Sequence, residues 1–175
     1  MSKPTIAKFA RSNWSYNREQ SAVDAVALTV LTACSSSDKY EPAKEPTKVT
    51  FSLVSDEGVN PNIWGEASPI EIQVFELKDD SMFMSSDYDQ IKTDYKKALR
   101  SNFVKNYDYV LTPGQFKFVN AFEVDEETNY IGVMAHFAEP ELSEWKKAVK
   151  VINKGREYHL LMLFKDYDVK LDRVE

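Results

Sequence analysis

The sequence predicts a β-sandwich with a small helical insertion, which occupies residues 49–175 of the 175-residue chain. Three observations support this fold class. Seven or eight short segments have strand patterns, turn residues separate these segments, and one segment has clear helical spacing. The length suits a single folded domain, and the sequence contains no recognisable internal repeat.

The first two strands are predicted at residues 48–54 and 70–74, where polar and apolar residues alternate. Pro69 precedes the second strand, at a position where a missing backbone donor is tolerated. Between these strands lies a 14-residue connection, residues 55–68, that is rich in Gly, Asn and Pro. Compact domains rarely keep a loop of this length without using it, so this loop is a candidate site.

A helix is predicted at residues 88–99. Residues 86–89 can cap its N-terminus. Positions 88, 91, 95, 98 and 99 are apolar and follow the spacing of one helical face. This helix is the predicted insertion into the sandwich.

A hairpin is predicted from residues 107–111 and 116–119. The turn between them, residues 112–115, has Pro113 and Gly114 at its centre, which is typical of a type II turn.

The last strands of the domain follow this turn. Residues 130–137 are nearly all apolar and predict a central strand that is buried on both faces. Residues 142–149 fit either a helix or a strand, and both interpretations stay open. Residues 153–155 predict a turn, which leads into strands at 158–164 and 169–171.

Composition and charge exclude several classes of function. The chain has 22 basic and 28 acidic residues, a formal charge of −6. This balance disfavours a nucleic-acid-binding protein, which needs a basic face, and also disfavours binding to anionic lipid by charge alone. The single cysteine, Cys34, excludes an intramolecular disulfide framework and a Cys-rich metal site.

The sequence predicts no catalytic residue, metal site or cofactor, so we expect a protein that is not an enzyme. It contains no Gly-rich phosphate loop, no HExxH motif and no nucleophile elbow. His136 and His159 fall on different predicted strands and are interpreted as structural or partly exposed residues. The acidic residues at 79–80 and 125–127 lie at predicted turns, where solvated charge explains them.

The N-terminus has the pattern of a secretory signal peptide. An uncharged run ends at Cys34, and at about ten residues it is too short to span a bilayer, which needs roughly 20. Residues 31–34, Leu-Thr-Ala-Cys, resemble the lipobox of bacterial lipoproteins. The alternative is a buried free thiol on an N-terminal helix of a cytosolic protein. Four basic residues precede the run: Lys3, Lys8, Arg11 and Arg18.

The lipobox resemblance implies three segments: a signal peptide at residues 1–33, a lipidated cysteine with a flexible tether at 34–48, and the sandwich at 49–175. Cys34 would be the lipidation site and the mature N-terminus. Ser35 resembles the sorting residue of lipoproteins that are delivered to the outer membrane. Removal of the signal leaves 142 residues (175 − 33) with 18 basic and 26 acidic side chains, a charge of −8. Acyl chains would then have to provide the membrane attachment.

The long loop contains an apolar pair, Ile63 and Trp64, among polar and turn-forming residues. Aromatic anchors of this kind dominate protein interfaces, because a large apolar area is buried at little cost in rotamer entropy. The alternative is that Trp64 folds back onto the sandwich as a plug. The candidate partner-binding residues are Asn60, Pro61, Asn62, Ile63, Trp64 and Gly65.

Several motifs together resemble the type VI secretion lipoprotein family TssJ, also called SciN or VasD. They are the lipobox, the tether, the Asn-Pro-Asn sequence at 60–62 that leads through Gly65 and Ser68-Pro69 into the strand at 70–77, Leu-Thr-Pro-Gly at 111–114, and the strand at 131–137. The resemblance covers most of residues 49–171.

This resemblance implies a transthyretin-like β-sandwich with an added helical element, anchored by lipid to the inner leaflet of the outer membrane of a Gram-negative bacterium. The family binds the periplasmic C-terminal domain of the inner-membrane protein TssM and belongs to the TssJ-TssL-TssM membrane complex. Its contact to TssM is the loop between the first two strands, here residues 56–68. The alternative function is a periplasmic transthyretin-like carrier or enzyme, with a small-molecule pocket near His136 or His159.

Overall fold

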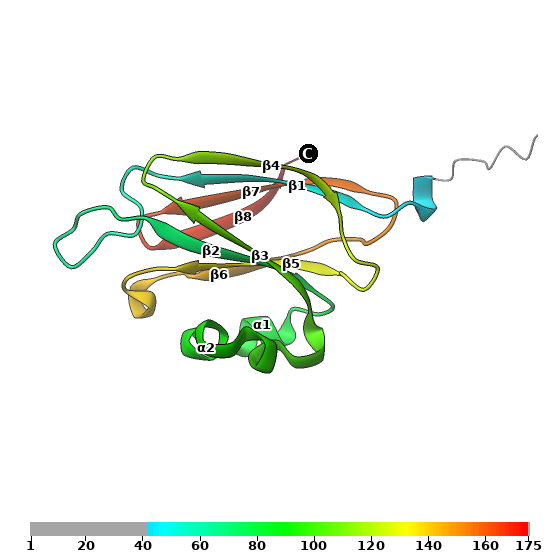
Figure 1. Ribbon diagram of the computed structural model, residues 1–175, viewed down its shortest axis with the longest axis horizontal. Helices are drawn as coiled ribbons and strands as arrows, with labels where there is room; N and C mark the ends of the chain where they lie inside the picture. Colours follow the sequence, from blue (N-terminus) through cyan, green and yellow to red (C-terminus); the bar gives the residue numbers. More distant parts are fainter. Residues whose placement is uncertain (1–41, 175) are drawn as a thin grey trace, which may run out of the picture. The chain divides into compact units, whose positions relative to one another are not determined.

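The computed structural model describes residues 42–174, which form two four-stranded β-sheets packed face to face (Figure 1). The predicted two-sheet sandwich with a helical insertion is therefore confirmed. The strand order is β4-β1-β7-β8 in one sheet and β3-β2-β5-β6 in the other. The strands are β1 (Lys48–Ser55), β2 (Ile70–Leu77), β3 (Phe103–Leu111), β4 (Phe116–Glu123), β5 (Tyr130–His136), β6 (Lys146–Lys150), β7 (Glu157–Lys165) and β8 (Asp168–Val174).

The helices are short. They are α1 (Ser81–Ser85), α2 (Tyr88–Leu99) and the 3₁₀ turns η1 (Pro42–Lys44), η2 (Arg100–Asn102) and η3 (Pro140–Leu142). Helix α2 begins at the predicted cap, because the Asp87 carboxylate accepts the backbone N–H of Gln90 and the Gln90 side chain accepts that of Asp87. Helix α1, only five residues long, was not predicted from the sequence.

The predicted hairpin of residues 107–111 and 116–119 is wrong. Strand β3 pairs with β2 and strand β4 pairs with β1, so the turn between β3 and β4 carries the chain from one sheet to the other. The turn itself is as predicted, since Gly114 has a φ of 72° and the Gln115 N–H donates to the Thr112 carbonyl. Ser55, the last residue of β1, bonds to this turn. Its N–H donates to the Gln115 carbonyl, and its hydroxyl donates to the Thr112 carbonyl.

Apolar side chains from both sheets fill the space between them. The inward-facing residues of β1, Phe51 and Leu53, are fully buried, as the alternation predicted. The Phe51 ring lies edge-on to Phe122 of β4, with 5.2 Å between ring centroids, and Tyr107 of β3 contacts both rings. The inner aromatic side chains of β3 and β4 therefore meet across the interior, which is the packing reason that these strands do not form a hairpin.

Helices α1 and α2 cover the outer face of the sheet β3-β2-β5-β6 (Figure 1). Their buried side chains form a second core with Phe75, Leu77 and Met134. Strand β5 is consequently buried on both faces, as predicted for residues 130–137. Gly132 of β5 lies directly beneath α1: a Cβ atom there would come within 3.1 Å of both Leu77 and Phe83.

The ambiguous segment 142–149 is resolved as η3 followed by strand β6. Val149 pairs with Ile131 of β5, and the Trp145 ring lies edge-on to Tyr88 of α2 at 5.3 Å. The helical interpretation is wrong because the backbone of residues 146–150 pairs with β5. This pairing satisfies the backbone N–H and carbonyl groups along the edge of β5.

The predicted signal peptide and most of the predicted tether lie outside the described residues. The structured domain begins before the predicted boundary at Val49, because the Glu45 carbonyl accepts the N–H of Gly155 and the Thr47 N–H donates to Asn153. A tether of the predicted kind would therefore end at about Lys44 and not at Lys48. Within residues 42–174, no helix is long and apolar enough to cross a membrane.

Lys146 of β6 fastens the helical insertion to its sheet. Its ammonium group donates to the carbonyls of Phe83, Met84 and Ser86, at 3.0, 2.8 and 2.5 Å, where α1 ends. It also lies 4.5 Å from the centroid of the Trp145 ring. A cation is favourable at a helix C-terminus, although burial lowers the pKa of Lys146.

We predict that Lys146→Met lowers the free energy of unfolding by about 2 kcal/mol, because three carbonyl groups lose a charged donor. The matched control is Lys147→Met on the same strand, which removes only an exposed ion pair with Glu144. Urea unfolding followed by circular dichroism measures both variants. Equal unfolding midpoints for the two variants would contradict the assigned role of Lys146.

Candidate functional site

The loop between β1 and β2, residues 56–69, projects from one end of the sandwich, whereas η1 lies at the opposite end (Figure 1). Strand β1 connects these two ends directly, and its eight residues span about 25 Å. The described chain therefore enters the sandwich at the end opposite to the loop.

The base of the loop is fixed by Asn60, which is only 5% exposed. Its side chain donates to the Pro69 carbonyl (2.8 Å) and accepts the N–H of Ala138 (2.7 Å). Its own N–H donates to the Asp166 carbonyl, and its carbonyl accepts the Ser68 hydroxyl. The backbone of Asn60 has a φ of 49°, a left-handed conformation that asparagine tolerates better than most residues.

The tip of the loop, residues 62–66, is organised by Asn62. Its side-chain oxygen accepts the N–H groups of Trp64 (2.9 Å) and Glu66 (3.0 Å), and its amide group donates to the Glu66 carboxylate. The Asn62 carbonyl accepts the N–H of Gly65, whose φ of 79° suits glycine. The tip thus has a defined backbone conformation that its own side chains maintain.

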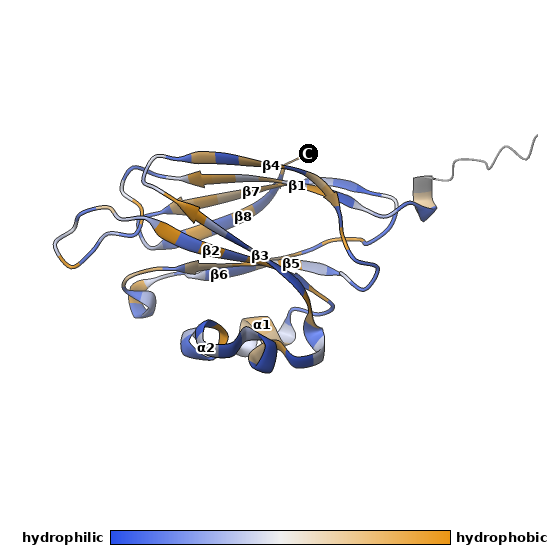
Figure 2. Cartoon of the chain, viewed as in Figure 1, coloured by the Kyte–Doolittle hydropathy of each residue, from blue (hydrophilic) through white to orange (hydrophobic). Residues whose placement is uncertain are grey.

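Ile63 and Trp64 point into solvent, with 75% and 78% of their surface exposed. Figure 2 shows a short hydrophobic stretch at the far end of this loop, between more hydrophilic residues. This exposure excludes the interpretation of Trp64 as a plug for the sandwich. The loop presents a pair of large apolar side chains and holds the backbone beneath them in place.

The six candidate residues therefore have different positions. Ile63, Trp64 and Gly65 are exposed at the tip, Pro61 and Asn62 are half-buried, and Asn60 is buried. Sequence reasoning missed the residues outside the loop that hold it, in particular Tyr167, whose hydroxyl donates to the Pro61 carbonyl at 3.1 Å. Cys34 and Ser35 lie outside the described residues.

The two histidines lie on different sheets and take part in separate hydrogen-bond networks. His159 of β7 contacts the hydroxyls of Thr50 and Ser52 and stacks on Phe118. His136 of β5 contacts the side chains of Gln73 and Tyr88, and burial lowers its pKa. Among residues 42–174, no group of three His, Cys, Asp or Glu side chains is arranged to bind a metal ion.

The polar contacts of His136 continue across the outer face of its sheet. Gln73 donates to the Asp108 carboxylate, Asn106 also donates to Asp108, and the Tyr95 hydroxyl donates to Asn106. A hollow of about 490 Å³ lies beside His136, and three of the side chains that line it, His136, Gln73 and Asp108, are connected by hydrogen bonds. This network connects helix α2 with β3, β2 and β5.

The acidic residues at predicted turns have local structural contacts. The Asp79 carboxylate accepts the N–H of Ser81, and hydrogen bonding by the Ser81 side chain and backbone lowers the pKa of Asp79. Asp125 similarly accepts the N–H of Glu127. Four of these five acidic residues are exposed and Asp80 is half-buried, which agrees with their interpretation as solvated charge.

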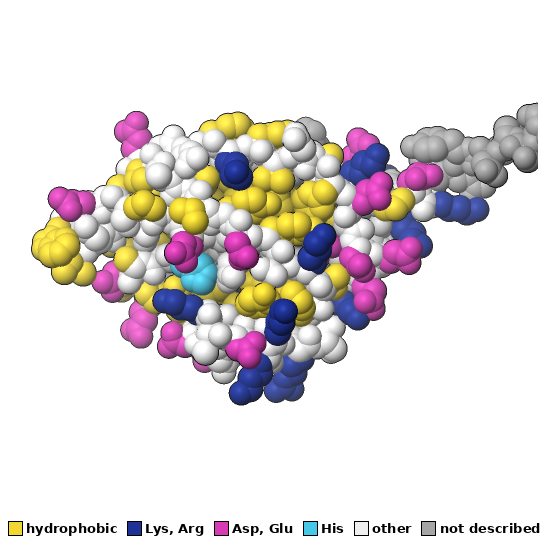
Figure 3. All heavy atoms as spheres, in the orientation of Figure 1, with side chains coloured by type: hydrophobic (Ala, Val, Ile, Leu, Met, Phe, Trp, Pro, Cys, Tyr) yellow, Lys and Arg dark blue, Asp and Glu magenta, His cyan; other side chains and the backbone are white. Residues whose placement is uncertain are grey.

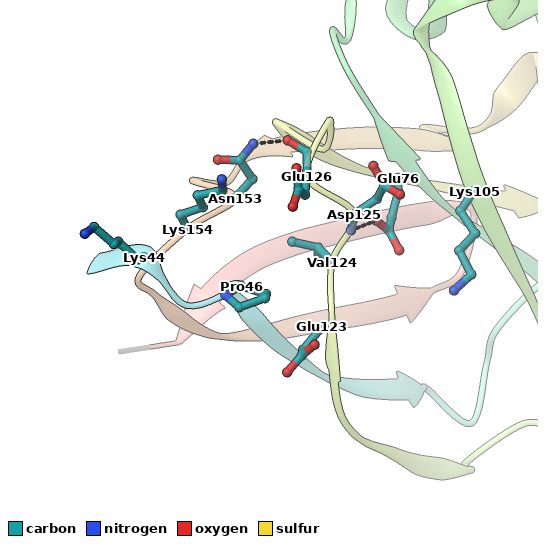
Figure 4. A pocket seen from close by; sticks show the side chains of 10 residues that line it. All are labelled: Lys44, Pro46, Glu76, Lys105, Glu123, Val124, Asp125, Glu126, Asn153 and Lys154. Atoms are coloured by element: carbon teal, nitrogen blue, oxygen red, sulfur yellow. Dashed lines mark hydrogen bonds between the residues drawn. The ribbon is translucent and has the colours of Figure 1, made fainter. Parts of the chain in front are cut away.

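A hollow of about 360 Å³ at the η1 end of the sandwich contains a buried carboxylate, Glu76 (Figure 4). Glu76 accepts three hydrogen bonds, from the Tyr107 hydroxyl (2.5 Å), the Thr128 hydroxyl (2.6 Å) and the Asp125 N–H (2.8 Å). Burial and the bond to Glu76 raise the pKa of Tyr107. Glu76 shares the inward face of β2 with Ile72 and Val74, and this break in the apolar pattern could have revealed it.

Comparisons with known proteins identify a family and a fold. The model of a family described as type VI secretion lipoprotein (VasD, EvfM, TssJ, VC_A0113) matches residues 47–173. No curated protein matches the chain in sequence.

Three solved structures share the fold. The type VI secretion lipoprotein TssJ1 of Pseudomonas aeruginosa is 23% identical with a TM-score of 0.70, over 74% of this chain and 98% of that one. Serratia marcescens Lip, a membrane-bound component of the type VI secretion system, is 22% identical with a TM-score of 0.63, over 74% and 97%. A chain in a structure described as the TssM C-terminal domain from EAEC is 20% identical with a TM-score of 0.60, over 73% and 98%. Because the family match covers most of the sequence, this chain belongs to the type VI secretion lipoprotein family.

Proposed function

We propose that this chain is a non-enzymatic outer-membrane lipoprotein that docks the type VI membrane complex, by binding the periplasmic C-terminal domain of TssM through the β1–β2 loop. Its membership of the type VI secretion lipoprotein family supports the system in which it acts. The partner is supported by the family resemblance and by the similarity to a chain in a structure described as the TssM C-terminal domain.

The exposure of Ile63 and Trp64 is the observation that carries this proposal. Large apolar side chains in water mark interaction sites, and tryptophan is prominent among the residues that dominate binding energy. The Asn62 hydrogen bonds hold the loop backbone before a partner arrives, so binding loses less conformational entropy.

The position of the loop also supports the proposal. The chain enters the domain through η1, and the loop lies at the other end of β1 (Figure 1). If Cys34 is lipidated and Ser35 directs the protein to the outer membrane, the residues up to Lys44 form a tether with a span on the order of 20 Å. The loop would then face the periplasm, where the C-terminal domain of TssM lies.

A periplasmic carrier or enzyme is the alternative, and the hollow beside His136 is the feature that favours it. A binding pocket needs convergent polar groups that are available to a ligand. In this hollow, the side chains of His136, Gln73 and Asp108 are already bonded to neighbours. In the described part of the chain, all buried side-chain polar atoms have partners. The docking function therefore accounts for more of the structure.

We predict that Trp64→Ala weakens binding to the TssM C-terminal domain by about 30-fold, since an interface anchor of this type contributes about 2 kcal/mol or more. The dissociation constant can be measured by biolayer interferometry with purified domains. The fold should be unaffected, because the Trp64 side chain is exposed.

The matched control is Ile152→Ala, which removes an apolar side chain that is 51% exposed at the opposite end of the sandwich. Its affinity should equal that of the wild type. Wild-type affinity for Trp64→Ala, in a protein that binds TssM, would show that the loop is not the docking site.

We predict that wild-type protein incorporates labelled palmitate in a Gram-negative host and that Cys34→Ser does not, because Cys34 carries the only thiol in the chain. Without several acyl chains, the variant should leave the membrane fraction. A wild-type protein that takes up no label would refute the lipid anchor.

A further inference from the structure

The end of the sandwich that carries the β1–β2 loop is acidic. Four connections meet there: residues 56–69, 112–115, 137–145 and 166–167, which we call the distal end. They contain seven acidic residues and neither lysine nor arginine. The acidic residues are Asp56, Glu57, Glu66, Glu139, Glu141, Glu144 and Asp166.

The opposite end of the sandwich has a mixed charge. Its connections, residues 42–47, 78–80, 124–129 and 151–156, contain six acidic and four basic residues. The acidity of the distal end is therefore a local property and does not simply follow from the negative charge of the whole chain.

The acidic groups of the distal end are largely available to a partner. Glu144 pairs with Lys147 at 2.8 Å, but within residues 42–174 no other acidic group of the distal end forms an ion pair. Glu57, Glu66 and Glu141 are exposed. The nearest basic residues in sequence are Lys165, which precedes Asp166, and Lys146, which is two positions after Glu144.

The acidic groups surround exposed apolar side chains. Ile63 and Trp64 form the tip, and the Glu66 carboxylate accepts a hydrogen bond from Asn62 in the same turn. Figure 3 shows acidic side chains near the apolar projection at this end. Leu142 of η3 is 74% exposed and lies among Glu139, Glu141 and Glu144 in sequence. This segment is connected to the loop through the Ala138 N–H, which donates to Asn60.

We propose that the distal end as a whole, including η3, is one docking surface, and that its partner presents an apolar pocket bordered by lysine and arginine side chains. This inference rests on the proposed function, because it describes the surface of TssM that receives the loop. The apolar tip supplies binding affinity. The surrounding acidic residues attract a basic partner, which raises the association rate constant, and they repel acidic surfaces.

The test is the association rate constant with the TssM C-terminal domain as a function of salt. For the wild type, it should fall steeply between about 50 and 500 mM NaCl, because salt screens charges over about a Debye length. Glu57→Lys/Glu141→Lys should lower the rate constant about tenfold or more at low salt and change the dissociation rate constant about twofold or less. Both side chains are exposed, and Trp64 stays in place.

The matched control is Glu123→Lys/Glu126→Lys, which changes the net charge equally at the opposite end of the sandwich. Its rate constants should stay within about twofold of the wild type. Equal slowing by the two double variants, or a wild-type association rate that does not respond to salt, would overturn the inference and leave the proposed function intact. A wild-type protein that does not bind the TssM domain would overturn both.

Discussion

The buried side chain of Asn60 is the constraint on which the candidate site depends. This side chain bonds to Pro69 just before β2 and to Ala138 after β5, and the backbone N–H of the same residue donates to Asp166 between β7 and β8. One residue thus connects turns from both sheets at the distal end. An aliphatic side chain in this place would remove the hydrogen-bond partners of the Ala138 N–H and the Pro69 carbonyl, which is unfavourable. The orientation of the loop is therefore a consequence of how the sandwich closes.

The two faces of the sheet β3-β2-β5-β6 explain the rest of the architecture. Its inner face packs on the other sheet, while its outer face is covered by α1 and α2 and held by Lys146. The sheet β4-β1-β7-β8 has no such cover from the described residues, and its outward positions include Ser52 and His159. Helix, sheet and sheet form three layers, and the loop extends from the end of the two-sheet part.

Local sequence patterns were sufficient to predict most of the helices and strands. Alternation identified β1 and β2, a continuous apolar run identified β5, and the cap at Asp87 marked the start of α2. Pairing between distant segments was not visible in these patterns. A Pro-Gly turn between two strands is equally compatible with a hairpin and with a crossing between sheets, and only the packing of Tyr107 on Phe51 and Phe122 decides between them.

The candidate site was also predictable only in the part that local sequence patterns determine. The length and composition of the loop identified it, and the apolar pair Ile63 and Trp64 was visible in the sequence. The different roles of Asn60 and Asn62 were not visible in the sequence. Asn60 is bonded to residues that are far away in sequence, whereas Asn62 organises a local turn. At 20–23% identity, related structures share the sandwich, so the fold does not depend on most individual side chains.

The most direct measurement is a hydrogen-exchange footprint of the domain with and without the TssM C-terminal domain. Docking at the distal end predicts slower exchange in peptides that cover residues 56–69 and 138–145, and unchanged exchange in peptides from α2 and from residues 151–156. Protection centred on the outer face of the sheet β4-β1-β7-β8, or on the hollow around Glu76, with none at Trp64, would contradict the account.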